Sequence, residues 1–296
     1  MQETGRGKGR QYSGNSGFSV QREMQMSRSQ KYDILVNFLK SYGSCAVAFS
    51  GGVDSTFLLW AAREALGDSV TALTASAPYM PKEEICEAGR IAETIGVRHA
   101  VLEIPLNEEI RFNPDDRCFR CKRQLFSAMK AEADQRGIPS VLDGSNLDDL
   151  QDYRPGMKAL KELKVPSPLL EQRWRKKEIR KIGREIGLPN WQKAPDACLL
   201  SRMPYGHEIT LRELDRIEKA ENYLRESGFR CVRVRSHGNL ARIEVGREER
   251  RDFFRETILD DVSRALKALG YVFVALELEG YESGNMNRSL LKSASS

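Results

Sequence analysis

An apolar run, Cys45 to Phe49, leads directly into Ser50-Gly51-Gly52-Val53-Asp54-Ser55. The run predicts a short buried strand, and apolar residues at helical spacing from Thr56 to Leu66 predict a helix after it. A strand that ends in two glycines and opens into a helix makes a cradle for phosphate. The glycines let the backbone approach an anion closely, and the free amides of the first helical turn point at it. The hydroxyls of Ser50 and Ser55 add two more donors.

This loop contains no lysine, so it differs from the Walker A loop. It resembles the PP-loop of the ATP pyrophosphatases, and the alternative is a plain glycine turn between a strand and a helix. The resemblance implies that ATP binds through Ser50, Gly51, Gly52 and Ser55. Its β- and γ-phosphates would form the leaving group, with Mg²⁺ near Asp54, while a substrate attacks the α-phosphorus.

Strand and helix patterns alternate through the first two thirds of the chain. Beyond the PP-loop, strands are predicted at 70–76, 99–106 and 140–144, and helices at 81–95, 121–135 and 174–187. Single helices between strands imply right-handed parallel crossovers and an α/β fold with a doubly wound sheet. Ligands bind beyond the carboxyl ends of such strands, so we expect Ser76 and Gly144 to line the nucleotide pocket.

The pattern changes after about residue 206. A helix from Ile209 to Gly228, a hairpin of 230–235 and 240–245, a helix at 248–269 and a strand at 271–278 predict a small α+β domain. We therefore expect a PP-loop domain at 30–206 and a smaller domain for sulfur transfer and substrate at 207–285. Residues 1–29 are predicted to be a disordered leader, and 286–296 a frayed tail.

Composition narrows the class of protein. The chain has 296 residues, of which 40% are hydrophobic and 30% charged, and no apolar run approaches the length of a membrane span. The net charge of +5 permits an anionic substrate but gives little support for a nucleic-acid groove. Six cysteines without a secretory signal indicate a reducing compartment, and we expect the cytoplasm.

Two cysteines are spaced for a shared ligand. Cys118 and Cys121 are three residues apart at the start of a predicted helix, and Cys198 in a polar loop is the best third member. A redox pair or two buried thiols are the alternatives for the first two. We predict the remaining cysteines to be buried structural thiols: Cys45, Cys86 and Cys231.

Three cysteine ligands fit two kinds of metal site. A zinc ion would take a fourth ligand, for which His207 or His237 is available. A 4Fe–4S cluster with three cysteines would instead leave one iron open. In an enzyme that activates its substrate with ATP, sulfide held at that iron would be a nucleophile.

Further segments carry a family resemblance. The PP-loop is followed by Asp143-Gly144-Ser145, Asp152-Tyr153-Arg154-Pro155-Gly156, Asn190-Trp191, Ser201-Arg202-Met203-Pro204-Tyr205-Gly206 and Val232-Arg233-Val234-Arg235. In this order, over about residues 30–288, the chain resembles the LarE family of ATP-dependent sulfur transferases of nickel-pincer nucleotide synthesis. The resemblance implies a small-molecule substrate, pyridinium-3,5-biscarboxylic acid mononucleotide, whose carboxylates become thiocarboxylates.

One branch of that family donates the sulfur of its own cysteine, at the position of Ala197 here. This chain departs from that branch, because the position holds alanine and Cys198 follows it. With Cys118 and Cys121, it resembles the branch that binds a 4Fe–4S cluster and passes on sulfide. The source that reloads the sulfide is not evident from the sequence.

The resemblance also implies roles for several charged residues. Lys122 would balance phosphate charge, although it could equally be a solvated helix lysine. Arg233 and Arg235 share one face of a strand and would bind the substrate phosphate; the alternative is a solvent-facing stripe. Arg202 and Glu221 match positions near the site of sulfur delivery.

Two rival functions stay open from the sequence. A tRNA-thiolating PP-loop enzyme would use the same cluster chemistry, but it needs a basic surface for RNA. A nucleotide-binding regulator with a structural zinc at the three cysteines would cleave no ATP. We expect neither a membrane nor a nucleic acid as partner, and we expect a homo-oligomer.

Overall fold

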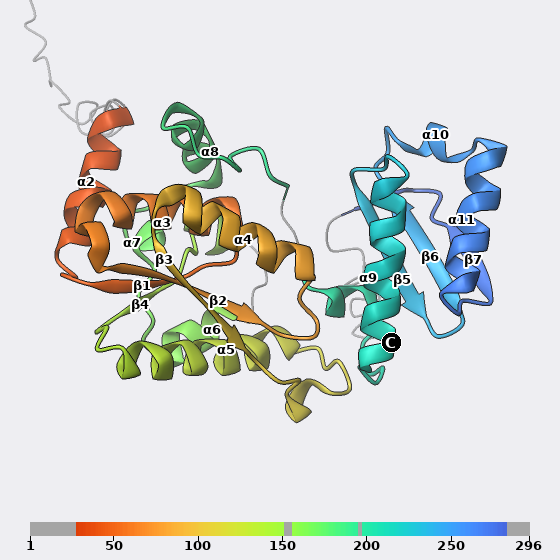
Figure 1. Cartoon of the computed structure of the whole chain (residues 1–296), viewed down its shortest axis with the longest axis horizontal. Helices are drawn as coiled ribbons and strands as arrows, with labels where there is room; N and C mark the ends of the chain where they lie inside the picture. Colours follow the sequence, from red (N-terminus) through yellow and green to blue (C-terminus); the bar gives the residue numbers. More distant parts are fainter. Residues whose placement is uncertain (1–27, 151–155, 195–196, 283–296) are drawn as a thin grey trace, which may run out of the picture.

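In the computed structural model, residues 28–150, 156–194 and 197–282 are described. Within these ranges the chain forms two units, each built on its own sheet (Figure 1). Almost all of the predicted leader and tail lies outside the described residues. Among the helices of these ranges, none combines the length and apolarity needed to cross a bilayer.

The larger unit contains a four-stranded parallel sheet in the order β3-β2-β1-β4. Its strands are β1 (Cys45–Ala48), β2 (Val70–Ser76), β3 (Arg98–Glu103) and β4 (Val141–Leu142). In the centre, Ala46 pairs with Thr71 on one side and with Val141 on the other. The chain order therefore reverses at β1, as the prediction of a doubly wound sheet requires.

Helices cover both faces of this sheet (Figure 1). One layer contains α2 (Arg28–Lys40), α3 (Val53–Leu66), α4 (Lys82–Ile95) and α8 (Lys176–Glu185), and the other contains α5 (Arg117–Gln135) and α6 (Gly156–Glu162). Because side chains alternate along a strand, Cys45 and Val47 pack under the first layer and Ala46 under the second. Both faces are covered at β1, which explains why residues 45–49 form an unbroken apolar run.

The links between these elements are short helices. They are η1 (Gly67–Ser69), η2 (Glu108–Ile110), η3 (Leu147–Leu150), α7 (Pro168–Glu171) and η4 (Leu199–Arg202). The last of these, η4, lies in the segment that the sequence predicts as an irregular loop, and it carries Ser201 and Arg202.

The smaller unit has the order β5-β6-β7, with β5 and β6 antiparallel and β7 parallel to β6. Its elements are α9 (Leu211–Glu226), β5 (Val232–His237), β6 (Leu240–Val245), α10 (Arg250–Phe253), α11 (Glu256–Ala268) and β7 (Phe273–Leu276). Leu224 of α9 and Leu266 of α11 share one core with Val234 and Ile243 of the sheet. The α/β fold with a smaller C-terminal α+β unit is thus confirmed.

The single helix predicted at 248–269 is wrong, because the chain forms α10 and α11 instead. Arg255 between them has an extended backbone, with φ −68° and ψ 129°, so the helical hydrogen bonds cannot continue through it. The break turns Phe253 into the core while Phe254 stays exposed.

Helix α9 belongs to both units. Leu214 and Ile217 in its first half pack into the core under α5, and Ala220 and Leu224 in its second half pack against β5. This shared helix sets η4 beside β5. The boundary predicted between residues 206 and 207 stays a prediction.

Candidate active site at the carboxyl edge of the sheet

The PP-loop has the conformation that its glycines predict. Gly51 has a φ of 70° and packs against α4, where an added Cβ would lie 3.2 Å from the Cα of Ala88. The carbonyl of Gly52 accepts hydrogen bonds from Ser55 Oγ (3.0 Å) and Thr56 Oγ1 (2.8 Å). The loop is therefore fixed by its own contacts, at the N-terminus of the 14-residue helix α3, where backbone amides favour an anion.

Asn190 supports this loop from behind. It is buried, and its Nδ2 donates to the carbonyl of Gly51 (2.8 Å) and to Thr56 Oγ1 (2.9 Å). Lys193 follows and forms ion pairs of 2.6 Å with both Glu84 and Glu87 of α4. These contacts tie the segment before Cys198 to the PP-loop.

Gly144, after β4, packs closely against the start of α3. A Cβ at this position would lie 3.1 Å from both the Cα and the amide nitrogen of Ser55. Ser76, at the end of β2, donates to Glu103 Oε2 over 3.0 Å. The structure therefore brings Gly144 against the PP-loop, whereas Ser76 interacts with the neighbouring strand end.

We predict that Gly144→Ala weakens ATP binding by about tenfold, because the first turn of α3 must move to admit the methyl group. Isothermal titration with a non-hydrolysable ATP analogue measures this. The matched control is Gly89→Ala, whose methyl group would meet His99 at 3.6 Å, an ordinary contact. Unchanged affinity in Gly144→Ala would contradict the close approach.

Asp54 is an acidic residue of the PP-loop, at the start of α3. Its Oδ2 accepts a hydrogen bond of 3.0 Å from Asn146 Nδ2. Burial and the charge of Asp149 raise the pKa of Asp54 to about 6, although Lys176 and Arg180 lower it. Asp149 itself is paired with Lys176 over 2.9 Å. Because ionising this carboxylate is costly in the free protein, a bound cation would stabilise its charged form. This fits the predicted Mg²⁺ beside the phosphates.

Lys122 points to the same edge of the sheet. Its Nζ lies 3.4 Å from Asp143 Oδ1 at the end of β4, and it is half-buried. Gly156, the first residue of α6, packs against its stem, since a Cβ there would lie 2.8 Å from Lys122 Cδ. The alternative of a freely solvated helix lysine is therefore wrong. Residues 151–155, which include most of the Asp152–Gly156 motif, lie outside the described part of the chain.

The three predicted cysteines come together at the start of α5 and before η4. Burial raises the pKa of Cys121 to about 12; the hydroxyl of Tyr79 and the charge of Lys122 lower it, and negative charge on Cys198 and Cys118 raises it. Cys121 therefore lies within electrostatic reach of both other thiols. Within the described ranges, no group of three or more His, Cys, Asp or Glu side chains has the geometry to hold a single metal ion.

The prediction that the other three cysteines are buried is confirmed only in part. Cys45 is fully buried in β1, and Cys231 is half-buried, but Cys86 is exposed on α4. The buried positions of α4 include Ala88, and Cys86 lies two residues, or about 200°, around the helix from it. The prediction of a buried Cys86 is therefore wrong.

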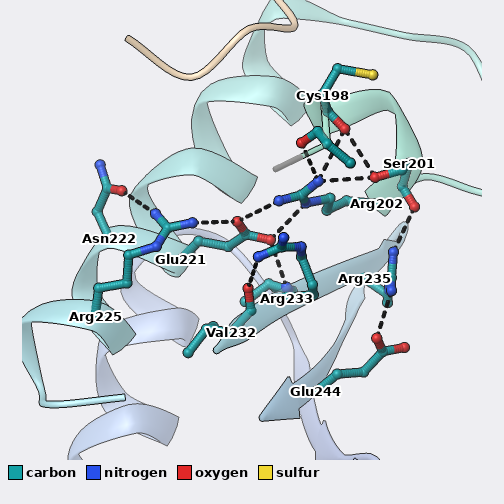
Figure 2. A network of polar contacts seen from close by, with 12 residues as sticks. Cys198, Ser201, Arg202, Glu221, Asn222, Arg225, Val232, Arg233, Arg235 and Glu244 are labelled. Carbon is teal, nitrogen blue, oxygen red and sulfur yellow. Dashed lines mark hydrogen bonds and ion pairs between the residues drawn. The ribbon is translucent and has the colours of Figure 1, made fainter. Parts of the chain in front are cut away.

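Arg202 anchors the loop that carries Cys198 (Figure 2). It is 1% exposed, and its Nε and Nη2 donate to both oxygens of Glu221 at 2.8 and 3.0 Å. Its Nη1 donates to the carbonyls of Ala197 (2.5 Å) and Cys198 (3.1 Å). In Figure 2 the sulfur of Cys198 points away from this guanidinium. All three guanidinium nitrogens of Arg202 therefore form hydrogen bonds with other groups of the protein.

Glu221 extends the network to β5. Its Oε1 also accepts from the amide of Val234 over 3.0 Å, and its Oε2 from Arg225 over 3.0 Å. Burial would raise the pKa of Glu221, but Arg202, Arg233 and the Val234 amide outweigh it and hold this pKa below its usual value. Glu221 is therefore an ionised buried carboxylate that links the Cys198 loop to the strand of Arg233 and Arg235.

Arg233 and Arg235 share the face of β5 that is turned away from α9 and α11. Both are buried, so the alternative of a solvent-facing stripe is wrong. Arg235 donates to the carbonyl of Ser201 (2.8 Å) and to Glu244 (2.6 Å), as Figure 2 shows. Arg233 donates to the carbonyl of Val232 and lies over the ring of Tyr281.

Comparison with known proteins decides the family. A model described as queuosine biosynthesis protein QueC matches residues 44–114, the segment that contains the PP-loop. Pyridinium-3,5-bisthiocarboxylic acid mononucleotide synthase of Lactiplantibacillus plantarum is 39% identical over 261 residues, which cover 87% of this chain and 94% of that protein. The chain belongs to the LarE family.

Two further relatives extend over nearly the same length. An uncharacterized protein of Synechocystis is 41% identical over 264 residues, 88% of this chain and 98% of that protein. An uncharacterized protein of Methanocaldococcus jannaschii is 30% identical over 237 residues, 80% and 90% of the two chains. The resemblance to the LarE family and to PP-loop pyrophosphatases is confirmed, while the roles of individual site residues stay predictions.

Two residues of this LarE-family site escape the sequence analysis. Tyr79 contacts Cys121, and the fully buried Asn113 donates from Nδ2 to the carbonyls of Met203 (3.0 Å) and Pro204 (2.9 Å). Asn113 has a φ of 46°, a conformation that asparagine tolerates better than most residues. The Asn-Pro pair at 113–114 signals a turn, but not what that turn would hold.

Proposed function

We propose that this protein is an ATP-dependent sulfur transferase that acts on pyridinium-3,5-biscarboxylic acid mononucleotide. The observation that carries the proposal is the meeting of a PP-loop and three cysteines at one edge of one sheet, in a chain of the LarE family. The relative from L. plantarum is named as a synthase of the bisthiocarboxylic acid mononucleotide, the product that this reaction would form.

The first step activates a substrate carboxylate. The amides and hydroxyls of Ser50 to Ser55 would hold the β- and γ-phosphates of ATP, and Asp54 would hold Mg²⁺, which would neutralise phosphate charge. A carboxylate oxygen of the substrate attacks the α-phosphorus, which gives an acyl adenylate and pyrophosphate. Lys122, 3.4 Å from Asp143 in the free protein, is placed to balance phosphate charge.

The second step replaces the adenylate by sulfur. Sulfide adds to the acyl carbon and AMP departs with the electron pair of the broken C–O bond, which leaves a thiocarboxylate. AMP is a good leaving group, whereas an unactivated carboxylate resists nucleophiles. The family resemblance implies that Ala197 stands where one branch has its sacrificial cysteine, so this proposal takes the sulfur from another donor.

In an enzyme that adds sulfur, three cysteines suit a 4Fe–4S cluster, because three thiolates leave one of its irons open. A single ion needs its sulfur ligands about 2.3 Å from one point. A cluster takes each thiolate on a different iron, so its ligands stand farther apart. When bound by Cys118, Cys121 and Cys198, such a cluster would supply one iron without a protein ligand, at which sulfide can be held.

The smaller unit would bind the mononucleotide. Arg233 and Arg235 provide two guanidinium groups beside the Cys198 loop, and such pairs suit phosphate. Arg235 is held by Glu244 and Ser201 in the free protein. Arg202 and Glu221 would act by positioning the loop and the strand. A cytoplasmic location, a homo-oligomer and the domain limits at 30–206 and 207–285 remain part of the proposal.

The test is turnover under strict anaerobiosis. Protein, Mg²⁺-ATP, sulfide and the biscarboxylic acid mononucleotide are incubated together, and AMP, pyrophosphate and thiocarboxylate are followed by mass spectrometry. We expect all three products and no pyrophosphate without the mononucleotide. Sulfur incorporated into tRNA, with none in the mononucleotide, would contradict the proposal and favour the thiolase alternative.

A further inference from the structure

Tyr79 touches both segments that carry the cysteines. It is fully buried in the loop after β2. Its phenol oxygen lies 3.2 Å from Cys121 Sγ, and its carbonyl accepts a hydrogen bond of 2.9 Å from the amide of Leu199, the residue after Cys198. A single residue therefore connects the cysteine pair of α5 with the loop of the third cysteine.

The hydroxyl of Tyr79 is buried with the rest of the side chain. A phenylalanine would fill the same space without the need to satisfy a buried hydroxyl. The hydroxyl therefore needs an explanation other than packing, and the sulfur of Cys121 provides it.

We propose that Tyr79 is a positioning residue for the cysteine site. Its phenol donates to the ligating sulfur of Cys121, and its backbone fixes the distance from that sulfur to the Cys198 loop. This proposal rests on the cluster named above as part of the function. A hydrogen bond to a ligating sulfur stabilises the extra negative charge of a reduced cluster, and so raises its reduction potential.

Asn113 also holds the Cys198 loop near α5, but it does so through backbone carbonyls. Asn113, four residues before the helix start that carries Cys118, donates to the carbonyls of Leu200, Met203 and Pro204. It holds the loop after Cys198 against the loop before α5. Because the side chain of Asn113 donates to backbone carbonyls, its removal would loosen the site without removing the hydrogen bond of Tyr79 to Cys121, and this separates the two residues.

The test compares Tyr79→Phe with Tyr32→Phe. Tyr32 is a buried tyrosine of the same unit whose hydroxyl donates to Glu64 over 2.9 Å, in the layer of α2 and α3. Both variants and the wild type are reconstituted anaerobically with iron and sulfide. We measure the reduction potential of the cluster and the rate at which iron passes to a chelator.

We expect Tyr79→Phe to bind as much iron as the wild type, to release it about tenfold faster, and to show a lower reduction potential. Tyr32→Phe should match the wild type in both measurements. Mere loosening of the site would admit water and raise the potential, so a raised potential would overturn the hydrogen-bonding role. Wild-type behaviour of Tyr79→Phe would overturn the proposal as well.

These outcomes separate the proposal from the function on which it rests. A loaded wild type with an unaffected Tyr79→Phe would contradict the role of Tyr79 alone. A wild type that binds no iron would overturn both the cluster and the role of Tyr79. In that case pyrophosphate release in the presence of the mononucleotide still shows whether the adenylation step stands.

Discussion

Asp54→Asn should lower ATP cleavage by about a thousandfold and at the same time stabilise the fold at neutral pH. Cleavage falls because an amide is a far poorer partner for Mg²⁺ beside the phosphates. Stability rises because the carboxylate is ionised at a cost: burial and Asp149 raise its pKa from 3.8 to about 6. A shift of this size corresponds to up to about 3 kcal/mol.

The pH dependence has a definite sign. Between pH 3.8 and about 6 the folded wild type binds more protons at Asp54 than the unfolded chain, so its free energy of unfolding falls as the pH rises through this range. Asparagine does not ionise, so the free energy of unfolding of the variant does not fall through this titration. The stability gain of the variant should therefore be complete above pH 6 and absent below about pH 4, as urea unfolding at several pH values would measure.

Asp148→Asn is the matched control. Asp148 accepts from the amide of Lys176 and from Arg175, and these contacts lower its pKa. Its replacement should leave ATP cleavage nearly unchanged and bring no gain in stability. A stabilised Asp148→Asn, or an Asp54→Asn that cleaves ATP normally, would contradict the assignment of Asp54.

Glu221→Ala should cost about 3–5 kcal/mol of unfolding free energy, because it leaves the buried Arg202 without its carboxylate. The amide of Val234 loses its acceptor in the same variant. We also expect thiocarboxylate formation to fall by about a hundredfold, since the Cys198 loop loses its anchor to β5. At saturating mononucleotide, pyrophosphate release should fall much less than thiocarboxylate formation, because ATP binds at the PP-loop in the other unit.

The measurements are urea unfolding and parallel assays of pyrophosphate and thiocarboxylate at low temperature, where the variant stays folded. Asp261→Ala serves as the control, since it breaks an exposed pair with Arg264 whose side chains are 53% and 75% exposed. Such pairs contribute less than about 1 kcal/mol. Equal losses in the two variants, or parallel losses of both products, would argue against a positioning network.

Local patterns were sufficient to predict most of the fold. The strand at 70–76 is found with its predicted limits, because an apolar run there lies between Gly67-Asp68 and Pro78. The sequence predicts one helix at 248–269, since apolar residues continue through Phe253 and Phe254. Its break depends on the backbone of Arg255, which periodicity does not reveal.

Local sequence patterns do not reveal which residues distant in the chain pair with each other in the fold. The pairing of Arg235 with Glu244 depends on the register of β5 and β6, and that of Arg202 with Glu221 on how η4 meets α9. The sequence marks Arg202, Glu221 and Arg235 only through family resemblance. Tyr79 resembles any core aromatic until its hydroxyl is seen beside Cys121.

The central claim is that Cys118, Cys121 and Cys198 hold an iron–sulfur cluster that serves ATP-dependent sulfur transfer. It is tested most directly by iron, zinc and acid-labile sulfide content of anaerobically purified wild type beside Cys198→Ala. We predict about four irons per chain with matching sulfide, lost in the variant. About one zinc per chain with no iron would contradict the account and leave an ATP-binding protein with structural cysteines.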